Sequence, residues 1–405
     1  MTKKILSAPD EPKQKTLNDF KLSTRKIRRY IKKLNLSRDE YIIALGLMGK
    51  GYRAERLLWS DNPGRYRGSK TLARMMVRHH RAAPAGRTYY MLTFNDDCGF
   101  TSDRVPHLAI QQTIDKVRRA VAGMGLHAFV MLEVHPLMNF PGGGAGRSLL
   151  LGAHAIAWSD QPFDHVRKAA ALCASPAWRC TLGADPVHIS VIAPNDLARV
   201  SHYLMKQRPD TKNLMPNKHK PGQLLMMDTT EGYRDEFAVR LFEGQSQVEL
   251  MNVMFGVGDG SVIRQALRTE IVQWHRKRTS AISVRKDVDV WAFWQRLRQS
   301  HGSKRFLPYR YDGCAIKPRV VIHRPCVPDP APQPTASVVD KPTVSKPAAA
   351  RPDTDFLGEA IAALVAKQAD AQSGPRTSRG KRKRIKPPEG RAKRPNRKIL
   401  GPRRD

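Results

Sequence analysis

The feature that most constrains the fold is the alternation of short strand-like and helix-like segments between residues 87 and 210. Residues 87–96 are rich in aromatic and β-branched residues and predict a strand, and the segments at 127–135, 149–158 and 186–192 are expected to form further strands. Apolar residues at helical spacing predict helices, at 105–125, 161–175 and 196–207. The order along the chain is therefore strand, helix, strand, strand, helix, strand, helix.

This order predicts an α+β fold. Right-handed crossovers favour a ferredoxin-like split βαβ core, an antiparallel four-stranded sheet with an added helix. In that topology the first and third strands lie in the middle of the sheet, and the second strand pairs with the third.

Polar residues interrupt the apolar pattern of two strands that should be neighbours. Successive side chains of a strand alternate between faces, so Glu133 and His135 share one face of 127–135, and His154 lies on a face of 149–158. A carboxylate beside imidazoles can bind a divalent cation such as Mg²⁺ or Mn²⁺. Two alternatives stay open: His154 is a hydrogen-bonded core histidine, and Glu133 pairs with an arginine from a helix.

The helix at 196–207 adds a tyrosine and a lysine. Leu197, Val200 and Leu204 form its apolar stripe, and Tyr203 lies at the edge of that stripe. Such a tyrosine can bury its ring and direct its hydroxyl into a cleft. A phenol is a weak nucleophile near neutral pH, and a metal ion or the ammonium of Lys206 would help it attack a phosphodiester. The alternative is a packing tyrosine with a solvated hydroxyl.

Together these motifs resemble the HUH endonuclease superfamily of rolling-circle replication initiators, relaxases and single-tyrosine transposases. The strand YMLTF at 90–94 is similar to the family's first motif, and His154-Ala155-Ile156 is similar to half of its His-hydrophobe-His motif. The YLMK sequence at 203–206 matches the YxxK helix of replication initiators. The resemblance covers about a third of the chain.

The resemblance implies a mechanism. Tyr203 would attack a scissile phosphate of single-stranded DNA, form a 5′-phosphotyrosine link and release a 3′-hydroxyl. Glu133 and His154 would hold the metal, and Lys206 would orient the phosphate or the tyrosine. The sequence departs from the family at Ile156, where a second histidine is expected. Either His135 substitutes from the adjacent strand, or the site has decayed and the domain only binds DNA.

Charge is concentrated at the two ends of the chain. The net charge is +35; residues 1–81 hold 21 Lys/Arg against seven Asp/Glu, and residues 376–405 hold 14 against two. Such a balance fits a polyanionic partner, because Lys and Arg displace counterions from nucleic acid. The candidate nucleic-acid contacts are Arg28, Arg29, Arg382, Lys383, Arg384 and Lys386.

Composition divides the chain into five regions. A basic helical region is expected at 1–86, with Ser23 and Ser37 as helix caps, followed by the α+β core at 87–210 and a helical accessory region at 211–324. Within the accessory region, 219–228 and 236–256 are expected to be mostly helical, and a further helix follows at 262–278. Eight prolines between Pro325 and Pro352 predict an extended linker over 325–375, with a short helix at 355–369. The basic tail, 376–405, is expected to be disordered.

Other features narrow the class of protein. No apolar run approaches the roughly 18 residues of a membrane-spanning helix, and no CxxC motif suggests a zinc finger or a disulfide framework. We expect a cytoplasmic, nucleoid-associated protein whose partners are single-stranded or origin duplex DNA and the replication machinery, not a membrane. Three functions remain: a metal-dependent nicking enzyme for replication initiation or mobilisation, a non-catalytic nucleic-acid-binding protein with a degenerate HUH-like fold, and a structural nucleoid protein.

Overall fold

The computed structural model describes residues 10–33, 36–49, 53–138, 147–182, 184–206, 211–216, 224–228, 235–280, 287–288, 290–300, 307–313 and 320–321. The chain divides into two units, Met1–Gln333 and Pro334–Asp405, and all described residues lie in the first. The predicted linker, the helix at 355–369 and the basic tail with Arg382, Lys383, Arg384 and Lys386 lie outside the described residues.

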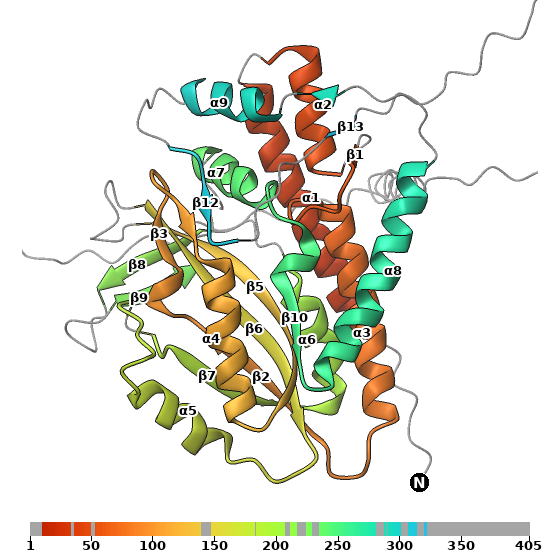
Figure 1. The fold of residues 1–405 in the computed structure, drawn as a ribbon, viewed down its shortest axis with the longest axis vertical. Helices are drawn as coiled ribbons and strands as arrows, with labels where there is room; N and C mark the ends of the chain where they lie inside the picture. Colours follow the sequence, from red (N-terminus) through yellow and green to blue (C-terminus); the bar gives the residue numbers. More distant parts are fainter. Residues whose placement is uncertain are drawn as a thin grey trace, which may run out of the picture. The chain divides into compact units, whose positions relative to one another are not determined.

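The centre of the first unit is a mostly antiparallel sheet (Figure 1). Its strands are β2 (Thr88–Phe94), β3 (Phe100–Ser102), β5 (His127–Met138), β6 (Arg147–Ser159), β7 (Val187–Ile192), β8 (Lys212–Pro216), β9 (Leu224–Asp228) and β10 (Met254–Val257). They follow the order β7-β2-β6-β5-β8-β9, while β10 also pairs with β5 and β3 with β6. The four predicted strands are β7, β2, β6 and β5, and the other four strands extend the predicted four-stranded sheet to eight.

Helices cover both faces of this sheet (Figure 1). They are α1 (Asp10–Lys32), α2 (Arg38–Leu47), α3 (Asn62–Arg81), α4 (Ile110–Gly123), α5 (His165–Ala174), α6 (Leu197–Leu204), α7 (Asp235–Gln245), α8 (Gly260–Ser280) and α9 (Val290–Ser300). Helices α4 and α5 contact the strands on one face, and α6 and α8 cover the other face with α3 packed against them. The described fold therefore combines helices with a mostly antiparallel sheet and is compatible with the α+β class.

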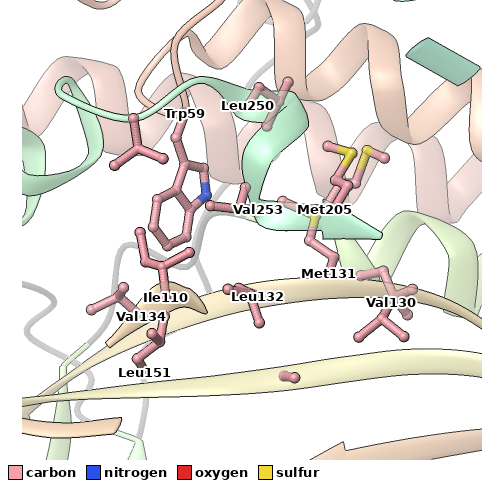
Figure 2. Packing of buried hydrophobic residues seen from close by; sticks show 14 of the residues in the cluster. Trp59, Ile110, Val130, Met131, Leu132, Val134, Leu151, Met205, Leu250 and Val253 are labelled. Carbon is pink, nitrogen blue, oxygen red and sulfur yellow. The ribbon is translucent and has the colours of Figure 1, made fainter. Parts of the chain in front are cut away.

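The sequence of the two central strands follows from this burial. Both faces of β5 and β6 are covered, so their residues are almost continuously apolar and buried instead of alternating with polar ones. Figure 2 shows part of this core, in which Met131 of β5 points toward Met205 at the end of α6, and Trp59 lies beside Val253. Polar residues at buried positions of these strands therefore need a specific explanation.

Three predicted helix starts are wrong. The helix expected from residue 161 begins at His165, after the Asp164 cap. The helix expected from residue 105 begins at Ile110, because His107–Leu108 forms strand β4, which pairs with β12 (Arg310–Tyr311). Ser23 is not a cap, since α1 starts at Asp10 and Ser23 is buried within it. Ser37 does cap α2, where its side chain accepts a hydrogen bond from the Glu40 amide and Glu40 returns one to the Ser37 amide.

The accessory region is less helical than predicted. Residues 224–228 form β9 instead of a helix, and α7 is followed by β10, which pairs with β5. Three short strands, β1 (Arg53–Ala54), β11 (Asp287–Val288) and β13 (Val320–Val321), form a separate small sheet. Short apolar runs fit helix and strand periodicities equally well, and here the pairing partner decides for a strand: β8 for β9, and the edge of β5 for β10. None of the helices in the described part of the chain combines the length and apolar character needed to cross a membrane.

Candidate metal centre and tyrosine site

The candidate site begins with the pairing of β5 and β6. Met131 is the register partner of His154, and Glu133 is the partner of Gly152. Residues opposite one another in an antiparallel pair share a face, so Glu133, His135 and His154 all lie on the face that α6 covers. The strand register alone therefore brings a carboxylate and two imidazoles together.

Their donor atoms converge on one carboxylate oxygen. Glu133 Oε2 lies 2.9 Å from His154 Nε2 and 3.7 Å from His135 Nε2. One donor atom from each of the three side chains lies within 4.8 Å of the other two. The His135 and His154 rings stand nearly perpendicular, at 88°, with their centroids 6.0 Å apart.

A glycine makes room for this cluster. A Cβ at Gly152 would lie 2.8 Å from the backbone carbonyl oxygen of Phe94, 3.1 Å from Asn95 Oδ1 and 3.9 Å from a ring carbon of His135. The first distance is shorter than van der Waals contact, and the atom concerned belongs to the backbone. Only glycine therefore fits opposite Glu133 without displacing β2.

Thr93 supports the cluster from the neighbouring strand. It is the β2 register partner of His154, and its Oγ1 lies 3.1 Å from His154 Nδ1. A hydroxyl both donates and accepts, so Thr93 can fix the imidazole ring whether Nδ1 carries a proton or not. A metal-ligating histidine uses its second ring nitrogen in this way.

The protonation states suit a cation. Burial by itself would raise the pKa of Glu133, but the nearby Lys206, His135 and His154 hold that pKa well below its ordinary value. Burial lowers the pKa of His135 to about 4, against the attraction of Glu133. At neutral pH Glu133 is therefore ionised and His135 is uncharged, as metal ligands must be.

The tyrosine lies on α6, and the lysine lies just after that helix. Tyr203 is half-buried, and its ring centroid lies 5.4 Å from that of His154, at an interplanar angle of 70°. Lys206 follows the end of the helix, with its Nζ 3.1 Å from the Tyr203 ring centroid and 3.5 Å from Glu133 Oε2. All five predicted catalytic and metal residues, namely Glu133, His135, His154, Tyr203 and Lys206, therefore meet on one face of the sheet.

Helix α3 fixes the end of α6. Arg65 is buried, and its Nη2 donates to the carbonyl oxygens of Lys206, at 2.5 Å, and Met205, at 3.4 Å. These two carbonyls directly follow the last helical residue, Leu204, and an arginine at this end also complements the helix dipole. One turn earlier, His202 Nδ1 lies 3.2 Å from Ser69 Oγ.

Other predicted residues lie elsewhere. Ile156 is buried on the same face two residues beyond His154, so the second imidazole of the cluster comes from His135 on the adjacent strand. Arg29 is exposed on α1, whereas Arg28 is half-buried and donates to the hydroxyl of Tyr41 at 3.2 Å. Neither arginine is part of the Glu133 cluster.

Three supporting residues were not identified from the sequence. Thr93 and Gly152 are predictable in principle, because each lies opposite a cluster residue once the strand register is known. No local sequence pattern identifies Arg65, because its role depends on how α3 packs against α6.

The donor atoms of Glu133, His135 and His154 fit a metal ion. Two nitrogens and one carboxylate oxygen are a common ligand set for catalytic first-row transition metals, and imidazole favours Mn²⁺, Fe²⁺ or Zn²⁺ over Mg²⁺. Ligands about 2.1 Å from a shared ion lie roughly 3.0–3.4 Å apart, close to the 2.9 and 3.7 Å found here.

The chain matches no family model, no curated protein and no solved structure.

Proposed function

We propose that this protein is a metal-dependent DNA-nicking enzyme of the HUH type, with Tyr203 as its single nucleophile, that serves replication initiation or mobilisation. The observation that carries the proposal is the meeting of a phenol, an ammonium and a His₂Glu ligand set on one sheet face. The strand order β7-β2-β6-β5 supports a ferredoxin-like core for this site, with β2 and β6 in the middle and β5 beside β6.

The chemistry is a transesterification. The Tyr203 oxygen forms a bond to the scissile phosphorus while the bond from phosphorus to the 3′-oxygen breaks. The phenol loses a proton, and the departing 3′-oxygen gains one to become the 3′-hydroxyl, so the protons balance. Glu133, His135 and His154 would hold the metal, with Mn²⁺ favoured over Mg²⁺ by the imidazoles, and the metal would polarise the phosphate. Lys206 would place positive charge beside the tyrosine and the phosphate.

The basic helices support a polyanionic substrate. Helix α3 carries six Lys/Arg and no Asp or Glu in 20 residues, and it packs against α6, which bears Tyr203. Arg74, Arg78 and Arg81 are exposed on α3, although Arg74 also pairs with Glu270. Exposed arginines on a helix beside the nucleophile suit the phosphates that flank a nick.

A second candidate is a DNA-binding protein that does not cut. The favouring observation is the contact between Lys206 and Glu133, which neutralises the carboxylate without a metal. Under this alternative the cluster is a buried polar network, and the basic helices provide the whole function.

A covalent trapping experiment tests the proposal. The full chain is incubated with Mn²⁺ and a labelled random pool of single-stranded DNA, and adducts that survive denaturant are collected and sequenced. We expect wild type to form an adduct on enriched sequences and Tyr203→Phe to form none.

The matched control is Tyr66→Phe. Tyr66 is a half-buried helical tyrosine that also lies beside a lysine, with Lys70 Nζ 5.7 Å from its ring centroid. This variant should retain the adduct. DNA binding by wild type without any adduct would establish the second candidate instead.

A further inference from the structure

One oxygen of Glu133 lies close to several cationic or proton-bearing groups. Lys206 Nζ lies 3.5 Å from Oε2, the same atom that His154 Nε2 approaches to 2.9 Å. Both the Lys206 and the Glu133 side chains are more than nine-tenths buried. The lysine therefore supplies a cation to the very oxygen that a metal would need.

A metal ion and this ammonium exclude one another. A bound dication would lie about 2.1 Å from the carboxylate oxygen and only a few ångströms from Nζ. Like charges at that separation, away from water, repel by several kcal/mol even at an effective dielectric constant of about 20. Occupation by the metal therefore requires the ammonium to leave Glu133.

The lysine can leave only by moving its side chain. Its backbone is fixed, because its carbonyl accepts from Arg65 at 2.5 Å and its amide donates to the carbonyl of Tyr203 at 3.1 Å. The ammonium already lies over the Tyr203 ring, and the four-carbon chain limits its reach, so a displaced ammonium stays near the nucleophile.

We infer that Lys206 is a tethered cation that a metal ion must displace from Glu133, so that metal loading also releases the ammonium to the DNA phosphate. This inference rests on the proposed function. In the metal-free protein the lysine neutralises the carboxylate; in the loaded protein it becomes available to substrate. By linkage, DNA that holds the displaced ammonium must strengthen metal binding by the factor by which metal strengthens DNA binding.

Metal titration of the full-length protein tests the inference without activity. The signal of free Mn²⁺ in electron paramagnetic resonance gives its affinity for wild type, Lys206→Gln, Lys206→Arg and Glu133→Gln. We expect Lys206→Gln to bind Mn²⁺ at least about tenfold more tightly than wild type, because the competing charge is gone. Lys206→Arg retains the charge and should bind no more tightly than wild type, and Glu133→Gln should lose binding.

Added single-stranded DNA provides a second readout. It should tighten Mn²⁺ binding by wild type and have a smaller effect on Lys206→Gln. If Lys206→Gln does not fold, Lys206→Met keeps an unbranched chain over the tyrosine ring; a neutral variant that folds only with Mn²⁺ also supports the inference.

The outcomes distinguish a failure of this inference from a failure of the proposed function. Equal or weaker Mn²⁺ binding by the neutral variants, with loss of binding in Glu133→Gln, overturns the inference and leaves the metal centre intact. Absence of Mn²⁺ binding in every protein, including Lys206→Gln, overturns both the inference and the metal dependence of the proposed function.

Discussion

At the scale of the residue, the cluster keeps charge where the surrounding strands are apolar. Glu133 lies between Leu132 and Val134 on a strand with both faces covered, yet its pKa stays well below the ordinary value. The neighbouring cation and imidazoles outweigh the cost of burial. The charge is therefore maintained by its neighbours, and its stability effects depend on their protonation.

This dependence predicts a loss of stability in mild acid. The pKa of His135 is about 4 in the folded protein and ordinarily about 6.5, so the unfolded chain binds the extra proton between these values. The free energy of unfolding should fall as the pH drops from 6.5 to 4, by up to roughly 3 kcal/mol from this residue. The lowered pKa of Glu133 adds a further loss below about pH 4.5.

Urea unfolding of wild type and His135→Gln at several pH values measures this effect. The variant should show a flatter profile between pH 6.5 and 4, with the chelator EDTA present throughout. An equally steep profile in the variant would mean that other groups cause the acid sensitivity.

A second residue prediction concerns the glycine opposite Glu133. Gly152→Ala places a Cβ 2.8 Å from the Phe94 carbonyl oxygen, so β2 and β6 must separate locally. We expect a loss of roughly 1–3 kcal/mol in the free energy of unfolding and weaker Mn²⁺ binding. Gly123→Ala is the control, because a Cβ there meets no atom within 4 Å. It should leave stability unchanged or raise it by up to about 1 kcal/mol; similar losses in both variants would contradict the crowding argument.

At the scale of the element, the position of Tyr203 beside the Glu133 cluster depends on how α6 is held. The helix spans only Leu197–Leu204, too short to be stable by itself, so packing must fix Tyr203 and Lys206. Arg65 from α3 binds the two carbonyls that follow the helix. The basic helix α3 thus contributes a buried structural residue as well as exposed charge.

Removing the Arg65 side chain should affect adduct formation by Tyr203 and leave metal binding in place. Arg65→Met loses two bonds from a charged donor, which should cost about 1.5–3 kcal/mol of stability and reduce adduct formation. Mn²⁺ binding should not weaken, because the three proposed metal ligands lie on strands. Arg67→Met is the control: Arg67 pairs at the surface with Glu270 and should cost less than about 1 kcal/mol. Urea unfolding, Mn²⁺ titration and the trapping assay measure the three quantities, and a parallel loss of metal binding would contradict this division.

The elements also show what the sequence could and could not predict. The strands carrying Glu133, His135 and His154 were predictable because their apolar runs at 127–135 and 149–158 are local features of the sequence, and strand alternation then assigned each polar residue to a face. Strand β10 was not predictable, because Met254–Val257 becomes a strand only by pairing with β5, over a hundred residues away in the chain. The start of α4 was missed for the same reason, because β4 needs β12. Arg65 depends on packing between helices, which no local pattern encodes.

At the scale of the whole molecule, positive charge is divided between the folded helices and the chain end. Exposed residues of α3, including Arg78 and Arg81, present charge at fixed positions near α6. Residues 376–405 carry 14 of the 71 Lys/Arg of the chain. These two sources should contribute differently: the helices to cutting at a defined place, the end segment to general affinity for nucleic acid.

Truncation tests this division. Deleting 376–405 removes cations that would displace DNA counterions, so affinity for single-stranded DNA should fall and the slope of log affinity against log salt should become less negative by at least about 2. The free energy of unfolding should not change, because the segment lies in the unit beyond Gln333 and has no part in the described sheet. The comparison is Arg78→Gln/Arg81→Gln, which removes only two charges and should change the slope by about 1 while lowering adduct yield at saturating DNA. Fluorescence anisotropy across a salt series gives both slopes. An unchanged slope after truncation would assign DNA affinity to the helices, and the molecule would then rely on one interface instead of two.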